Sequence, residues 1–183
     1  MEYVRSAGPK GSEDMEIREV VYAVMVRRLK EHLEAPRGMV PRIYAPASEV
    51  ELSDLGQFCE QPLEVSYRNF LATTNGMDYF ESDLSAFSSG DWPDSVRVVE
   101  ACEFAATLRD IGILQDVGLP QNAELFPVAF DDDSTIGIFM IDVEGVGERF
   151  WMVGNGDSIF FTKFSEILSY FLDPLAGAFR SAV

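Results

Sequence analysis

This 183-residue chain has little of what disulfide frameworks, metal sites and membrane spans require. It contains two cysteines, Cys59 and Cys102, and one histidine, His32. Two cysteines so far apart form neither a disulfide framework nor a metal knuckle, and free cysteine often behaves as a small buried hydrophobe. No apolar run approaches the ~20 residues that cross a bilayer, and residues 1–10 lack the apolar core of a signal peptide. We therefore expect buried thiols, no metal, no membrane contact and a cytoplasmic location.

Basic residues are scarce and unevenly distributed. Fourteen Lys and Arg stand against 31 Asp and Glu, a formal net charge of −17. Residues 1–44 hold eight bases and seven acids, whereas residues 45–183 hold six bases and 24 acids. No Lys or Arg occurs between Asp110 and Glu148, where there are nine acids. Nucleic acid is disfavoured as a direct ligand because phosphate binding needs cations, and a basic partner is favoured, although an acidic surface can also serve solubility alone.

Signatures of catalysis are missing as well. His32 lies near the end of an expected helix, and no nucleophile motif surrounds it. Gly154-Asn155-Gly156 lacks the later glycine and the strand-to-helix context of a dinucleotide loop. Asp131-Asp132-Asp133 lacks the alternating spacing of a calcium loop and is interpreted as a solvated turn. We therefore expect no enzyme and no cofactor, with paired catalytic carboxylates left open among 31 acids.

What the chain does have is a hydrophobic fraction of 47%, which is typical of a folded domain with one core. Residues 13–34 are predicted to form a helix, because Ser12 can cap it, its first turns are acidic and bases follow near its end. Its apolar residues form a broad face, blurred by β-branched side chains. They are Ile17, Val20, Val21, Val24, Met25, Leu29 and Leu33. This face needs a surface to pack on.

Two further helices are predicted after a proline-rich connection at residues 35–47. Ser48-x-x-Glu51 matches a capping box and predicts a helix at 49–59. A third helix is expected at 63–74, ended by Asn75-Gly76 in a left-handed cap. The residues expected to be buried by these helices and the sheet are Leu55, Phe70, Leu71 and Phe139.

The second half of the chain is typical of strands separated by turns. Short strands are expected near residues 84–87 and 96–99, followed by a helix at about 102–114. A closing helix is expected at 164–172. Four longer strands lie between these helices, at 125–130, 136–143, 150–153 and 158–162. The predicted class is α+β: N-terminal helices packed on an antiparallel-rich, mixed sheet of four to six strands, with a C-terminal helix.

One segment carries a family signature. It reads Val50-Glu51-Leu52-x-x-Leu55-Gly56-Gln57-x-x-Glu60-Gln61-Pro62-Leu63-x-x-x-Tyr67-Arg68-Asn69-Phe70-Leu71-x-x-x-Asn75-Gly76. This order resembles the SUKH superfamily, which includes the fungal cell-wall-synthesis regulators of the Smi and Knr type. The resemblance continues more loosely through Leu125–Asp131, 136–139 and 161–168. It departs from the family where a Gly-Asp pair is replaced by Asp132-Asp133-Ser134.

The resemblance implies a function that the residues alone do not. Many bacterial SUKH proteins are immunity proteins that bind a cognate toxin domain, often a nuclease. Because nucleases are commonly basic, an acidic inhibitor is steered toward them. We expect such a basic toxin domain as the partner, with Trp92 either as an aromatic anchor or as core filling. The residues expected to bind it are Asp91, Trp92, Asp94, Asp131, Asp132, Asp133, Glu144 and Glu148.

Residues 1–47 are interpreted as an N-terminal extension with one helix, and residues 48–183 as a single SUKH-like domain. Two alternatives to the immunity function stay open: a Smi/Knr-type regulator or scaffold that binds endogenous partners, and an enzyme of unrecognised type. The identity of the toxin, the binding face, the role of helix 13–34 and the oligomeric state are left open by the sequence.

Overall fold

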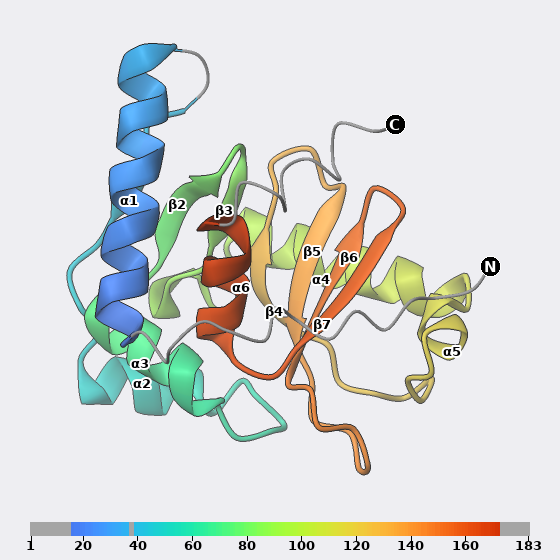
Figure 1. Cartoon of the computed structure of the whole chain (residues 1–183). Coiled ribbons are helices and arrows are strands. Elements are labelled where there is room, and N and C mark those ends of the chain that lie inside the picture. Colours follow the sequence, from blue (N-terminus) through green and yellow to red (C-terminus); the bar gives the residue numbers. More distant parts are fainter. Residues whose placement is uncertain (1–15, 37–38, 173–183) are drawn as a thin grey trace.

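The structure, a computed structural model, describes residues 16–36 and 39–172 (Figure 1). Its helices are α1 (Ile17–Glu34), α2 (Glu49–Leu55), α3 (Val65–Thr73), α4 (Val96–Asp110), α5 (Ile113–Asp116) and α6 (Phe164–Leu172). Its strands are β1 (Arg42–Ile43), β2 (Met77–Glu81), β3 (Leu84–Ala86), β4 (Phe126–Phe130), β5 (Ile136–Met140), β6 (Phe150–Gly154) and β7 (Asp157–Phe161). A short 3-10 helix, Ser89–Asp91, precedes α4.

The seven strands form one sheet in chain order, and every neighbouring pair is antiparallel. The predicted α+β class with a C-terminal helix is confirmed. The sheet has more strands than the four to six expected, and it is not mixed. β1 and β2 were not predicted: β1 has two residues, and the β2–β3 pairing is interrupted by a register shift between Met77 and Glu81.

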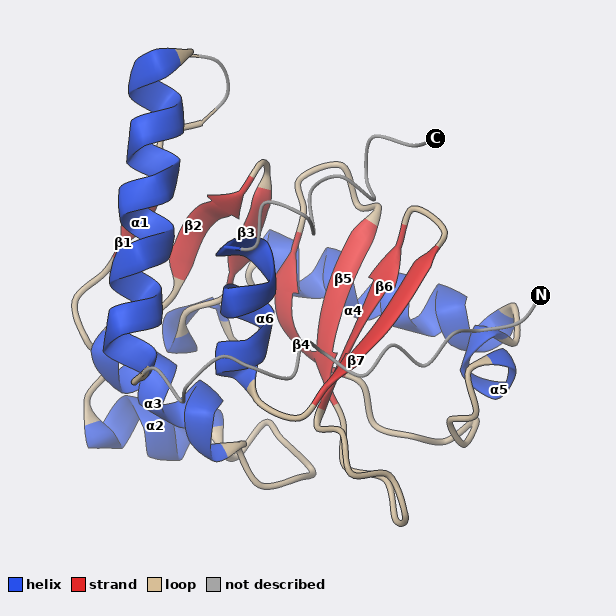
Figure 2. Cartoon of the chain, viewed as in Figure 1, coloured by secondary structure: helices blue, strands red, loops and turns tan. Residues whose placement is uncertain are grey.

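Helices cover both faces of the sheet, α1, α3 and α6 on one and α4 on the other (Figure 2). The strands divide their side chains between the two layers because successive residues point to opposite faces. On β5, Ile138 and Met140 join the core beneath α1, α3 and α6, whereas Phe139 joins the core beneath α4 and α5. The sheet thereby separates a larger front core from a smaller rear core.

The first helix belongs to the front core. Its buried residues are Val20, Val21 and Val24. Arg27 ion-pairs with Glu81, and Arg28 donates from Nε to the carbonyl oxygen of Tyr79 at 3.1 Å. The predicted apolar face is wrong at its C-terminal end, where Leu29 and Leu33 are exposed. Residues 13–15 of the predicted helix lie outside the described residues, and the domain boundary at residue 47 stays a prediction.

Polar residues in and beside the SUKH-like segment cap its two helices. Ser48 and Glu51 form the predicted capping box, and Glu64 caps α3 by accepting from the backbone of Ser66 and Tyr67 at 2.9 Å each. The burial of Leu55, Phe70, Leu71 and Phe139 is confirmed. The helices are shorter than predicted, since α2 ends at Leu55 and α3 covers Val65–Thr73.

Asn75 and Gly76 do not cap α3, because the helix ends at Thr73 and the next residue, Thr74, has an extended backbone. They instead fasten the start of the sheet to the chain after β3. The Asn75 side chain accepts from the Ser89 backbone at 2.7 Å and donates to its hydroxyl at 2.8 Å. Gly76 has a φ of +94°, and a Cβ there would lie 3.0 Å from the Ser88 nitrogen.

Three further expectations need correction. Residues 96–99 form the first turn of α4 rather than a strand, because Ser95 accepts a hydrogen bond from the backbone of Val98 and caps a helix. The helix expected at 102–114 is two helices, α4 and α5, separated by Gly112 at a φ of +82°. Cys102 is exposed rather than buried.

In the described part of the chain, no helix combines the length and apolar character needed to cross a membrane.

Candidate functional site: an acidic end of the sheet

Three hairpin turns meet at one end of the sheet. The registers place them there, because Glu81 pairs with Leu84, Phe130 pairs with Gly137, and Gly154 pairs with Asp157. β3 and β4 are neighbours, as are β5 and β6, so the three turns lie side by side at the same end of the strands. We call this the three-turn end; its acids are Asp83, Asp131, Asp132, Asp133 and Asp157.

The carboxylates at the three-turn end repel one another. Asp83 is half-buried, and loss of solvent raises the pKa of its carboxyl; the charges of Asp131, Asp133 and Asp132 raise the pKa further. Asp132, Asp133 and Asp157 are exposed. One arginine reaches this group, since Arg97 lies 3.4 Å from Asp132 and 3.6 Å from Asp78. The end therefore keeps an excess of negative charge.

Asp131 differs from its two neighbours in the turn. It is 2% exposed, and its carboxylate accepts hydrogen bonds from the backbone nitrogens of Thr135 at 2.8 Å and Ile136 at 2.9 Å. The Thr135 hydroxyl donates to the same carboxylate at 2.5 Å. The expectation of a fully solvated turn is wrong for this residue, because Asp131 shapes the turn that presents Asp132 and Asp133.

The turn between β6 and β7 packs tightly against the turn between β4 and β5. Gly154 has a φ of +148°, and a Cβ at this position would lie 2.0 Å from the carbonyl oxygen of Thr135. No side chain fits in that space. The backbones of the two turns therefore lie close together, which brings Asp133 and Asp157 to the same end of the sheet.

The residues around Trp92 lie elsewhere. The indole of Trp92 is half-buried and stacks on Phe126, with ring centroids 4.1 Å apart and an interplanar angle of 6°. Phe126 begins β4, at the opposite end of that strand from Asp131. Asp91 accepts hydrogen bonds from the backbone and hydroxyl of Ser88 at 2.7 Å each, whereas Asp94 is exposed. These contacts favour core filling for Trp92; its role as a partner anchor stays a prediction.

Glu144 and Glu148 lie in the loop after β5, at the end of the sheet opposite the three-turn end. Glu144 is exposed and Glu148 is half-buried. The eight residues predicted to bind a partner therefore do not form one surface. Asp132 and Asp133 share the three-turn end, which also contains Asp83 and Asp157.

Sequence reasoning missed Asp83 and Asp157 because they lie far from residues 131–133 in the chain. The Gly154-Asn155-Gly156-Asp157 turn was recognised, but its position beside the Asp-rich turn depends on the pairing of β5 with β6. Asp83 required a strand at 77–81 that the sequence did not suggest.

The arginines between residues 48 and 172 make contacts within the molecule. Arg149 donates to the carbonyl oxygens of Ile141 at 2.8 Å and Pro62 at 3.1 Å. Arg109 donates to the carbonyl oxygens of residues 121 and 123 at 3.1 Å each. Arg68 ion-pairs with Glu49, and Arg97 with the aspartates described above. Arg109 and Arg149 thus donate to backbone carbonyl oxygens rather than to carboxylates.

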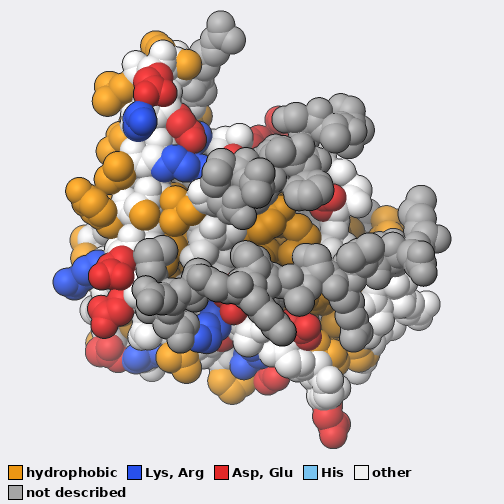
Figure 3. Space-filling view, viewed as in Figure 1, with side chains coloured by type: hydrophobic (Ala, Val, Ile, Leu, Met, Phe, Trp, Pro, Cys, Tyr) orange, Lys and Arg blue, Asp and Glu red, His pale blue; other side chains and the backbone are white. Residues whose placement is uncertain are grey.

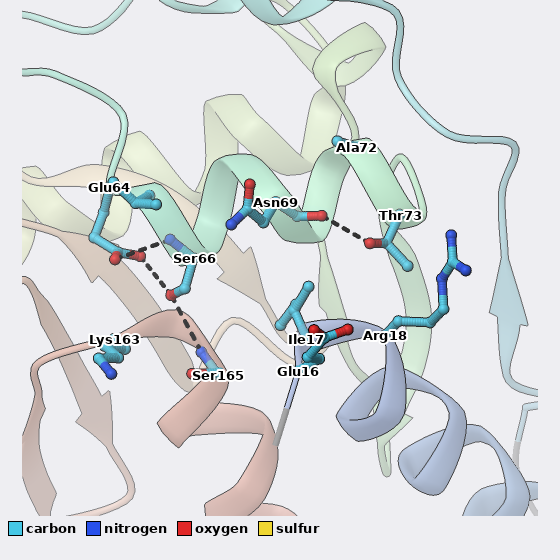
Figure 4. Close-up of a pocket in the computed structure, with 11 residues that line it drawn as sticks. Glu16, Ile17, Arg18, Glu64, Ser66, Asn69, Ala72, Thr73, Lys163 and Ser165 are labelled. Carbon is cyan, nitrogen blue, oxygen red and sulfur yellow. Dashed lines mark hydrogen bonds between the residues drawn. The ribbon is translucent and has the colours of Figure 1, made fainter. Parts of the chain in front are cut away.

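A groove of about 680 Å³ lies between α1, α3 and the start of α6 (Figure 4). The polar atoms of Glu64 and Ser66 in its wall already serve the adjoining helices. Glu64 caps α3, and the Ser66 hydroxyl accepts from the backbone of Phe164 at 2.7 Å.

Within the described ranges, no group of three His, Cys, Asp or Glu side chains is placed to hold a metal ion. Burial raises the pKa of the Cys59 thiol to about 12.

No protein-family model matches the chain, and no curated protein matches it. The SUKH resemblance therefore stays a prediction that rests on the sequence motif alone.

Proposed function

We propose that this protein is an immunity protein of the SUKH type, which binds and neutralises a cognate basic toxin domain through protein–protein contact. The three-turn end is its main electrostatic contact surface. The observation that supports this proposal most is the excess of carboxylates at the three-turn end. Among the five aspartates that define it, Asp132 forms an ion pair with Arg97, and burial and the charges of the Asp-rich turn raise the pKa of Asp83. Asp83, Asp133 and Asp157 present negative charge on a rigid framework.

The physical basis of the proposal is steering. The basic groove of a nuclease and the acidic three-turn end attract each other over about the Debye length, which is roughly 8 Å at physiological salt. The contacts at Gly154 and Asp131 order the turn backbone before binding, which lowers the conformational entropy lost on association. Occupying the groove would exclude the nucleic acid that the toxin cleaves. The proposal places this encounter in the cytoplasm, where a toxin-producing cell needs protection.

The test uses a toxin domain encoded by the neighbouring gene, which the proposal requires. We expect the purified proteins to form a complex, the complex to abolish the toxin's activity, and the association rate to fall steeply as ionic strength rises. A regulator of the Smi/Knr type would instead leave the toxin active and retain endogenous proteins. Failure to bind the neighbouring toxin would refute the immunity function.

A further inference from the structure

The first helix is apolar on two opposite sides. One side holds Val20, Val21 and Val24 and faces the core. The other holds Tyr22, Val26, Leu29 and Leu33, of which Tyr22 is 72% and Leu33 is 81% exposed. We call these four residues the α1 outer stripe. Figure 3 shows hydrophobic side chains along this outer edge of the helix.

Further exposed hydrophobic residues follow the stripe closely in the chain. Of the 14 large hydrophobic residues that are exposed in the described chain, eight lie between residues 22 and 44. The four beyond the stripe are Met39, Val40, Ile43 and Tyr44, on the segment that leads to and follows the edge strand β1. Exposed hydrophobic residues gathered in this way mark interaction surfaces, whereas isolated ones do not.

The spacing of the stripe fits a second copy of the same helix. Tyr22, Val26, Leu29 and Leu33 are separated by four, three and four residues, the 3.5-residue period of a coiled-coil seam. This pattern reads the same in both directions. A two-fold axis midway between Val26 and Leu29 places Tyr22 against the second copy's Leu33, and Val26 against its Leu29. Such self-complementarity is what a two-fold symmetric interface requires.

Charge also selects a second copy at this surface. Residues 16–34 hold four bases and four acids, in a chain whose net charge is −17. Two copies repel each other least where their surfaces are neutral. In the antiparallel arrangement, the flanking Lys30 lies near the second copy's Ala23 and His32 near its Met25, so no like charges meet. A basic partner, in contrast, is attracted to the carboxylates of the three-turn end.

We propose that this protein forms a two-fold symmetric homodimer through antiparallel packing of the α1 outer stripes, with the β1 edge at its rim. The dimer does not depend on the proposed toxin-binding function, because it uses a different surface. It leaves the three-turn end of each copy free.

The test measures the molecular mass of the full chain by sedimentation equilibrium over a wide range of protein concentration. We expect a monomer–dimer equilibrium. The double substitution Tyr22→Glu with Leu33→Glu should raise the dissociation constant by about thirtyfold or more. Both side chains are mostly exposed, so the circular dichroism spectrum and Tm of the monomer should be retained. A chain that stays monomeric at every concentration would overturn the proposal.

The matched control is the double substitution Val50→Glu with Val96→Glu. These valines are 69% and 71% exposed and lie on α2 and α4, so the control adds the same charge to equally exposed sites elsewhere. It should leave the dimer intact. Equal loss of the dimer in both variants would mean that added charge, and not the stripe, is responsible, which contradicts the proposal.

Cross-linking tests the orientation. In a Cys102→Ser background, Val26→Cys and Leu29→Cys chains should form disulfide-linked dimers faster when mixed than when each is alone. Faster cross-linking of each variant with itself would show a parallel arrangement and refute the antiparallel one.

Discussion

Both ends of the sheet carry acidic residues, but the contacts of their polar and charged groups differ. At the end beside the SUKH-like segment, Arg149 joins the carbonyl oxygens of Ile141 and Pro62, and the Gln61 amide donates to Met140 at 3.2 Å. At the three-turn end, Arg97 lies 3.4 Å from Asp132, and burial and the neighbouring aspartates raise the pKa of the Asp83 carboxyl. At the first end, the side chains of Arg149 and Gln61 bond to the backbone of neighbouring segments. At the three-turn end, the carboxylates of Asp132, Asp133 and Asp157 are exposed to solvent.

The comparison explains why the SUKH-like segment need not contain the binding site. Glu51, Glu64 and Asn75 of the SUKH-like segment cap helices or fasten loops. These roles specify the fold and leave the sheet's far end unconstrained. In the proposed function, the contact surface consists of turn residues outside this segment.

The largest effect on stability at the three-turn end is expected from Asp131→Ala. The substitution leaves the backbone nitrogens of Thr135 and Ile136 without their acceptor, which should lower the free energy of unfolding by roughly 2 kcal/mol. Urea denaturation measures the change. Asp133→Ala in the same turn is the control and should alter stability by less than about 0.5 kcal/mol. Equal effects of the two substitutions would show that Asp131 does not organise the turn.

A smaller effect is expected from Asp83→Asn. The folded state raises the pKa of this carboxyl, so the ionised form at neutral pH costs stability, and stability is lost as pH rises through the folded pKa. Removing the charge should therefore stabilise the protein at neutral pH. The gain should shrink as pH falls and Asp83 becomes protonated, and it should also shrink with added salt. Thermal unfolding across this pH range checks the sign; a variant less stable than the parent at neutral pH would contradict the account.

Local sequence patterns predicted the elements whose determinants lie within a few residues. The capping box at Ser48 and the closing helix at 164–172 are examples. Val96–Val99 was misassigned because β-branched residues favour strands, while the Ser95 cap and the burial of Val98 decide for a helix. β2 escaped recognition because Tyr79, with a φ of +54°, interrupts its regular pairing.

The candidate site was predictable only in part. The Asp-rich turn is visible in the sequence, and its negative charge follows from composition. That Asp131 is buried, and that Asp83 and Asp157 join its neighbours, depends on which strands lie side by side. Strand order is a tertiary property that no local pattern of this chain encodes.

The most direct test of the central claim reverses charge at each end of the sheet. Asp133→Lys with Asp157→Lys alters the three-turn end, and Asp142→Lys with Glu144→Lys alters exposed acids at the opposite end by the same total charge. The measurement is the rate of association with the neighbouring toxin domain at low and at high salt. We predict that the first pair slows association about tenfold or more at low salt and flattens its salt dependence, while the second pair has a much smaller effect. Equal slowing by both pairs, or no slowing by the first, would contradict the assignment of the three-turn end as the binding surface.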